Sequence, residues 1–269
     1  MNQLNAHHDL EGLAGSPVLG IVSGFGPMAG TDLLRKVIAN TNVNEDKEHL
    51  PVMLLSVPPE GSDFLGGKMK VNPGTRIGKT LLAMEAMNVS IAAVACNTIH
   101  APIIFDEIVR VLKDAGAKIK LLHMIGEVTD FLKRSSIPIN KDDAKIGLLA
   151  TSGTIKSRIY QDHLNSAGYS VLLPDETTQT QVYDAIYNAD FGIKGHSYPI
   201  SAVAINYLSA AARHLVDRGA SCIVVGCTEL PLFFSEPFFE DVPVIDATNI
   251  LARALVREAA PGKLKLIAE

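Results

Sequence analysis

Cysteine is scarce in this chain, which has only Cys96, Cys222 and Cys227 among its 269 residues. Three thiols form no disulfide framework in a protein of this size, so a reducing, cytoplasmic setting is expected. Long apolar runs are also lacking, and none approaches the roughly 20 residues that a membrane-spanning helix needs. Positive charge is not in excess either: the net charge of −5 argues against a nucleic-acid or membrane partner.

The composition is that of an ordinary globular protein, with 47% hydrophobic and 20% charged residues. The chain is long enough for one large domain or two smaller ones, each with its own core. Residues 1–16 have neither a basic start nor an apolar centre. We therefore expect them to form a short flexible leader rather than a signal peptide.

Short apolar runs alternate with helical stretches, an order typical of α/β proteins with parallel sheets. The predicted strands cover residues 18–23, 51–57, 89–95, 145–150, 170–173, 221–226 and 242–246. The predicted helices begin near residues 29 and 101 or cover residues 75–88, 157–166, 201–218 and 249–258. Between them, residues 58–74 form a Gly- and Pro-rich connection of a length typical of lids and binding loops.

The chain repeats itself in two halves. The segment VACNTIHAP at residues 94–102 matches VGCTELP at 225–231, and a strand with a glycine loop precedes each at a similar distance. We predict two similar domains, each a mainly parallel sheet flanked by helices, related by a pseudo-twofold axis with the active site between them. The expected domains are 17–112 plus 228–269, and 113–227.

Cys96 and Cys227 each follow a predicted strand, where ligands of α/β sheets bind. If the halves face each other, the two thiols lie on opposite sides of one cleft. Inverting a stereocentre requires removal of a proton from one face and its return on the other, which two opposed acid/base groups perform directly. Each cysteine also opens a helix in this prediction, which would lower the thiol pKa from about 8.5 towards neutrality.

The motif GFGPMA near the N-terminus, ACNTIH at residues 95–100 and GCTELP at 226–231 resemble the aspartate/glutamate racemase family. ATSGT at 150–154 and GIKG at 192–195 extend the similarity, which covers nearly the whole chain. The resemblance implies an amino-acid racemase that works without pyridoxal phosphate or another cofactor, with an amino acid as its small-molecule partner, and often a homodimer.

The same resemblance implies roles for individual residues. Cys96 and Cys227 correspond to the two catalytic bases. From their positions in the same two segments, and not from the resemblance, His100 and Glu229 are expected to support these residues. The candidate substrate contacts are Ser23, Gly24, Gly26, Pro27, Asn97, Thr98, Thr151, Lys194 and Thr228.

One position departs from the family pattern. Aspartate-specific relatives carry an arginine after the second strand, where it binds the side-chain carboxylate, but this chain reads VPPEGSDFLGG there. The substrate therefore stays open, with Lys194, Lys68 or Arg76 as alternative anchors.

Other interpretations of these residues remain at this point. Cys222 lies inside an apolar strand and is expected in the core, and His100 or His123 is either structural or functional. Asp246 is expected to cap the last helix, and Glu229 could cap its own. GFGPMA also fits a relaxed dinucleotide-binding pattern, and Cys96, His100, His123 and Cys227 could form a zinc site.

Two other functions fit the same framework. A cysteine-dependent decarboxylase or cis–trans isomerase of a dicarboxylic acid would look alike in sequence. A non-catalytic protein that kept the cleft for small-molecule binding would also share these motifs.

Overall fold

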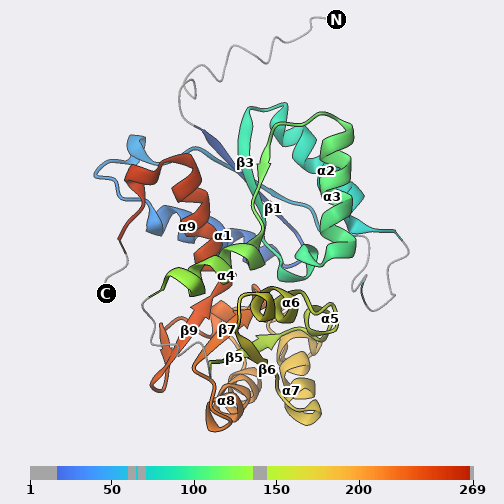
Figure 1. The fold of residues 1–269 in the computed structure, drawn as a ribbon, viewed down its shortest axis with the longest axis vertical. Coiled ribbons are helices and arrows are strands. Elements are labelled where there is room, and N and C mark those ends of the chain that lie inside the picture. Colours follow the sequence, from blue (N-terminus) through green and yellow to red (C-terminus); the bar gives the residue numbers. More distant parts are fainter. Residues whose placement is uncertain (1–16, 60–64, 66–70, 136–143, 267–269) are drawn as a thin grey trace, which may run out of the picture.

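The structure, a computed structural model, describes residues 17–59, 65, 71–135 and 144–266 (Figure 1). The first half contains a four-stranded parallel sheet in the order β2-β1-β3-β4. Its strands are β1 (Val18–Ser23), β2 (Val52–Ser56), β3 (Val89–Val94) and β4 (Lys120–Leu121). Its helices are α1 (Pro27–Asn40), α2 (Pro73–Glu85), α3 (Pro102–Asp114) and α4 (Met124–Arg134), with short 3-10 helices η2 (Asp46–Glu48) and η3 (Asn97–His100).

The second half contains a five-stranded sheet in the order β6-β5-β7-β9-β8, parallel except for β8. Its strands are β5 (Lys145–Ala150), β6 (Ser170–Leu172), β7 (Cys222–Gly226), β8 (Phe238–Phe239) and β9 (Val242–Asp246). Its helices are α5 (Ser152–Lys156), α6 (Ile159–Ser166), α7 (Glu176–Tyr187), α8 (Ala202–Asp217) and α9 (Ala247–Ala259), with 3-10 helices η4 (Leu230–Leu232) and η5 (Pro261–Lys263). The prediction of two similar α/β halves with mainly parallel sheets is confirmed.

Strand alternation distributes the apolar side chains over three core clusters. In β1, Leu19 and Ile21 point into a core shared by both halves, while Val18 and Val22 point towards α2 and α3. The shared core continues into the second sheet through Ile146 and contains α1, α4, α6 and α9. The other face of the second sheet packs on α7 and α8. Because one core is continuous between the sheets, the two halves are held together by apolar burial.

The chain crosses between the halves more than once. Hydrogen bonding places β4 in the first sheet and β9 in the second, after which α9 returns to pack on α1 and α4 (Figure 1). The domain boundaries 17–112 plus 228–269 and 113–227 stay a prediction. The expected leader, residues 1–16, lies outside the described residues, as do 60–64 and 66–70 of the expected lid.

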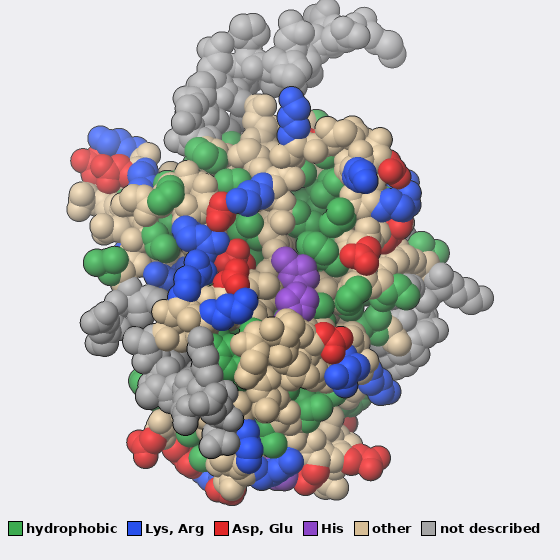
Figure 2. All heavy atoms as spheres, in the orientation of Figure 1, with side chains coloured by type: hydrophobic (Ala, Val, Ile, Leu, Met, Phe, Trp, Pro, Cys, Tyr) green, Lys and Arg blue, Asp and Glu red, His purple; other side chains and the backbone are tan. Residues whose placement is uncertain are grey.

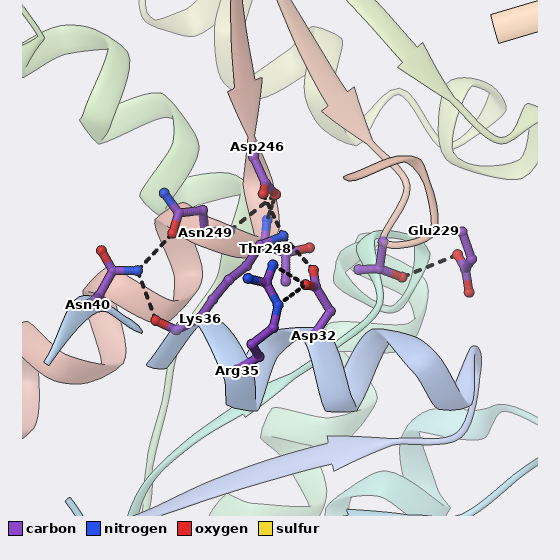
Figure 3. Close-up of polar contacts among 9 residues, drawn as sticks. Asp32, Arg35, Lys36, Asn40, Glu229, Asp246, Thr248 and Asn249 are labelled. Atoms are coloured by element: carbon purple, nitrogen blue, oxygen red, sulfur yellow. Dashed lines mark hydrogen bonds and ion pairs between the residues drawn. The ribbon is translucent and has the colours of Figure 1, made fainter. Parts of the chain in front are cut away.

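Polar contacts fix the position of α9 (Figure 3). Lys36 of α1, 7% exposed, forms ion pairs with Asp32 on its own helix and with Asp246 at the end of β9, the latter at 2.6 Å. The Asp246 carboxylate also accepts hydrogen bonds from the backbone N–H of Thr248 and Asn249, which confirms its predicted capping of the last helix. The same carboxylate therefore begins α9 and ties it to α1.

Most predicted elements are present, and the main differences lie in the helices. The expected helix at 157–166 begins at Ile159, as α6, because Arg158 adopts a left-handed φ of 60° at its N-cap. The short helix α5 forms in the expected glycine loop at 150–154. The helices α4 and α7 were not predicted, and the first turns of α7 are polar and lack apolar periodicity. None of the described helices is both long and apolar enough to cross a bilayer.

Three histidines form a stack where the two halves meet, and histidine side chains are visible in the middle of the face in Figure 2. The ring of His123 lies 4.8 Å from that of His100 and 5.0 Å from that of His163, measured between centroids. His123 also caps α4, because its Nδ1 accepts the N–H of Gly126 at 3.0 Å. Burial lowers the pKa of His100 to about 3 and that of His123 to about 4, helped by mutual repulsion.

This histidine stack should make the protein sensitive to acid. As pH falls from 6.5 towards the folded pKa values of about 4 and about 3, the unfolded chain binds protons at His100 and His123 that the folded protein does not bind. The free energy of unfolding therefore falls as pH falls. Each such proton contributes up to about 1.4 kcal/mol per pH unit. Urea unfolding at several pH values measures the slope. His123→Asn, which keeps a capping acceptor, should flatten it, whereas exposed His196→Asn should not; equal slopes would contradict the assignment.

Candidate active site

The registers of the two sheets bring the strand ends together in the same way in each half. In the first sheet Val22 pairs with Val94, so the chain after β1 lies beside Cys96. In the second, Ala150 pairs with Gly226, so Thr151 lies beside Cys227. Each cysteine thus leaves a buried central strand at its carboxyl end, next to the loop that follows a neighbouring strand.

Both cysteines line one cavity of about 770 Å³ between the halves. From the first half it is lined by Gly24, Phe25, Gly26, Pro59, Leu65, Pro73, Cys96, Asn97, Thr98, Ile99 and Ile104. From the second it is lined by Thr151, Ser152, Gly153, Lys156, Glu176, Gln179, Thr180, Tyr183, Tyr187, Lys194, Gly226, Cys227, Thr228 and Glu229. This volume lies within the range of small-molecule sites.

Glu229 is the centre of the charged part of the cavity. Its Oε2 accepts hydrogen bonds from the Cys227 thiol at 3.1 Å and from the Thr228 hydroxyl at 3.3 Å. Its Oε1 lies 3.1 Å from Nζ of Lys194, which also donates to the carbonyl of Phe25. The side chain of Glu229 is 4% exposed, and Figure 3 shows it beside the β7 end. The side chain of Glu229 makes no capping hydrogen bond, although it could have capped its helix. It contacts the Cys227 thiol and the Lys194 ammonium instead.

Gly26 provides the space for this arrangement. A Cβ atom at that position would lie 1.7 Å from Oε1 of Glu229 and 3.4 Å from Nζ of Lys194. Any side chain there would displace the carboxylate that contacts Cys227. The glycine loop of the first half is thus shaped around an ion pair of the second half.

Three threonine hydroxyls connect the halves on another wall of the cavity. Thr98 Oγ1 lies 2.8 Å from Oγ1 of Thr154, which in turn lies 3.0 Å from Oγ1 of Thr151. Thr151 also caps α5 by accepting the N–H of Thr154. Hydroxyls can reorient to donate or accept, so Thr98 and Thr151, which line the cavity, can donate to a ligand oxygen.

Asn97 is held by a tyrosine from the other half. The Tyr160 hydroxyl donates to Oδ1 of Asn97 at 2.6 Å, and both residues are buried. Nδ2 of Asn97 is buried with no hydrogen-bond partner among the described residues. Because Oδ1 is occupied, the N–H groups of Nδ2 are the side-chain donors that remain to Asn97, a residue of the cavity wall. An unsatisfied buried donor is costly, and a ligand carboxylate would satisfy it.

Burial dominates the titration of both thiols. It raises the pKa of Cys96, an effect that Lys194 opposes and Glu229 reinforces. Burial, followed by the Glu229 carboxylate, raises the pKa of Cys227 well above its ordinary value, against Lys194. The expectation of a thiol pKa near neutrality is therefore wrong for the ligand-free site. The segments after the cysteines form only short 3-10 helices, whose N–H groups do not offset desolvation.

Lys194 keeps its charge in this environment. Burial alone would lower the pKa of its ammonium, but Glu229 and the two cysteines together raise it. Nζ also lies 5.5 Å from the centre of the Tyr187 ring.

Several predicted residues lie elsewhere. Ser23 is buried, donates to the carbonyl of Gly26 and does not line the cavity, and Pro27 opens α1. His100, the last residue of η3, packs in the histidine stack, and Arg76 donates to the carbonyl of Pro58 outside the cavity wall. Lys68 lies outside the described residues. Cys222 is fully buried in β7, as predicted.

The zinc interpretation lacks its ligand set in the part of the chain described. No group of three or more His, Cys, Asp or Glu side chains is arranged there to hold a metal ion. His100 and His123 contact each other and Phe105 rather than a cysteine.

Sequence reasoning missed two polar residues of the site, Tyr160 and Gln179. Gln179 of α7 donates from Nε2 to the carbonyl of Ala150 at 3.0 Å, while its buried Oε1 has no partner among the described residues. The local sequence marks neither residue, because the partner of each one, Asn97 for Tyr160 and Ala150 for Gln179, lies far away in the chain.

Comparison with known proteins shows what this chain is similar to. A family model described as Asp/Glu/Hydantoin racemase matches residues 22–255. The aspartate racemase of Picrophilus torridus is 25% identical, with a TM-score of 0.74 over 93% of this chain and 96% of its own. The glutamate racemase of Francisella tularensis, solved with D-glutamate, is 16% identical with a TM-score of 0.60 over 94% and 84%, a likeness of fold.

A further relative is the protein of Pectobacterium carotovorum described as "Uncharacterized protein in pnlA 3'region". It is 37% identical over 113 residues, 42% of this chain and 71% of its own length. The family match confirms the predicted enzyme class, an isomerase of the amino-acid racemase type. By a match that spans both cysteine segments and both halves, the chain belongs to the Asp/Glu/hydantoin racemase family.

Proposed function

We propose that the protein is an amino-acid racemase that inverts Cα by proton transfer between Cys96 and Cys227, without pyridoxal phosphate. The observation that carries this proposal is that the two thiols, one from each half, line the same cavity. A cytoplasmic location and a homodimer belong to the proposal as well, with an amino acid as the only small-molecule partner.

The proposed step begins at Cys227. Its thiol proton passes to Glu229 Oε2, to which it is already hydrogen-bonded, and the thiolate removes the α-proton. The electron pair of the broken Cα–H bond stays on the substrate, and Cys96 donates its thiol proton to the opposite face. The Glu229 proton then returns through solvent to the Cys96 thiolate, so no atom is gained or lost. Reversal starts from Cys96.

The charged and polar groups fit this sequence. Lys194 lowers the pKa of both thiols and so stabilises whichever one is ionised. Nδ2 of Asn97 and the hydroxyls of Thr98 and Thr151 are donors for the substrate α-carboxylate, which accepts charge when the α-proton leaves. Gly24, Gly26 and Thr228 shape the wall around them.

Replacing either thiol should stop the reaction. We expect Cys96→Ala and Cys227→Ala each to reduce kcat for racemisation by about 1000-fold, since each removes one acid/base group. Deuterium uptake at Cα in D2O measures the exchange of the α-proton, and loss of optical rotation measures the inversion of Cα. Cys222→Ala, which removes a thiol from the core, is the matched control and should keep the rate. Full activity in either cysteine variant would refute the two-base proposal.

Glu229→Gln should shift the titration of Cys227. Removing the carboxylate next to the thiol while Lys194 remains should lower the pKa of Cys227, because Glu229 raises it and Lys194 lowers it. The rate of iodoacetamide labelling of the Cys227 peptide against pH, read by mass spectrometry, should move to lower pH. Exposed Glu176→Gln at the same cavity is the control. An unchanged or higher inflection contradicts the proposed role of Glu229.

Tyr160→Phe should loosen the Asn97 amide. Loss of the hydroxyl leaves Oδ1 without its donor, and a hydrogen bond of this kind contributes about 1 kcal/mol net. We expect kcat/KM to fall about fivefold, mostly through KM. Tyr169→Phe, a second buried tyrosine outside the cavity wall, should leave both constants unchanged. Equal losses in both variants would show a general packing effect instead.

A further inference from the structure

We infer that the amino acid accepted at this site carries an uncharged, apolar side chain, aromatic or branched aliphatic, rather than a carboxylate. The inference rests on the proposed function and concerns the part of the cavity that receives the side chain. It is argued from the charges, the apolar wall and the volume.

The buried charges of the cavity are already paired with each other. Among the described residues, its charged members are Lys156, Glu176, Lys194 and Glu229, and no arginine lines it. Nζ of Lys194 contacts Oε1 of Glu229 at 3.1 Å and the carbonyl of Phe25. A substrate carboxylate at Lys194 would therefore have only the third N–H of the ammonium to bind. It would also lie beside the Glu229 carboxylate, a like charge whose side chain is 4% exposed.

The two outer charges do not replace Lys194. Lys156 at the end of α5 and Glu176 at the start of α7 are both exposed to solvent. They have opposite signs, and water screens each of them. A side-chain carboxylate would therefore gain little from Lys156 and would lie in the same cavity as the Glu176 carboxylate.

Beside the polar side chains of Ser152, Gln179 and Thr180, the cavity presents apolar and aromatic surface. Phe25, Leu65 and Ile104 contribute from the first half. Opposite them, α7 presents Tyr183 and Tyr187, whose rings lie 4.9 Å apart and tilted. These tyrosines are 37% and 39% exposed, so a bound apolar group would remove much of this surface from water.

The size of the cavity agrees with this wall. About 770 Å³ falls in the range that encloses drug-sized ligands. The donors assigned to the α-carboxylate occupy only the Asn97 and threonine side. The volume towards α7 is therefore available for a large side chain.

A substrate panel on the wild-type protein tests the inference. Both enantiomers of Phe, Tyr, Leu, Met, Asp and Glu are supplied in D2O, and deuterium uptake at Cα gives kcat/KM, while calorimetry gives Kd. We expect at least one apolar amino acid to exceed Asp and Glu by about 100-fold. Preference for Asp or Glu would overturn the inference.

Binding separates this inference from the proposed reaction. Tight binding of an apolar amino acid without uptake would keep the side-chain class and refute the racemase mechanism. Binding of no apolar amino acid would refute the side-chain class, whatever the uptake with Asp or Glu shows.

Two variants test its physical causes. Glu229→Gln frees Lys194, so the affinity for Asp should rise at least tenfold; no rise would overturn the charge argument. Tyr183→Ala should weaken binding of the preferred apolar amino acid about tenfold, because it removes part of the apolar wall. Tyr198→Ala, 96% exposed and outside the cavity wall, is its control. Equal effects of the two tyrosine variants would overturn the assignment of the α7 wall.

Discussion

The contact between Lys194 and Glu229 is the constraint around which the cavity is built. It joins the loop after α7 to the end of β7, and through the Phe25 carbonyl it reaches the glycine loop of the first half. Gly26 must lack a side chain for the carboxylate to lie where it does. The same carboxylate contacts the Cys227 thiol. One ion pair therefore influences the shape of the glycine loop, the contact between the two halves and the pKa of Cys227.

Two opposing effects act on the thiols of the site. Burial raises the pKa of both cysteines, which favours the protonated thiol. The partly buried Lys194 ammonium opposes this effect at both sulfur atoms and so favours a thiolate. In a ligand-free site with two neutral thiols, each cysteine holds one proton, but the charged groups around the two sulfur atoms differ. The difference is on the Cys227 side, where the Glu229 carboxylate accepts a hydrogen bond from the thiol.

The sequence was informative where local chemistry and repetition decide the structure. Apolar strands of both halves and the two cysteine positions follow from short buried runs that end in small residues, and nearly all of them lie where predicted. Contacts between distant segments could not be predicted: Tyr160 on Asn97, Thr154 between Thr98 and Thr151, and Lys194 on Glu229. The thiol pKa was misjudged for the same reason, because desolvation is a property of the assembled cavity and not of a strand end.

The return of α9 to the first half has a consequence for synthesis. Helix α9 begins at residue 247, yet it fills the shared core against α1 and is fixed there by Lys36 and Asp246. The N-terminal sheet therefore leaves the ribosome long before the helix that covers its inner face. Until residues 247–259 have emerged, Leu33 and its neighbours on α1 lack their final partners. Completion of the N-terminal half is thus tied to the synthesis of α9, when the second half is already able to form its own sheet.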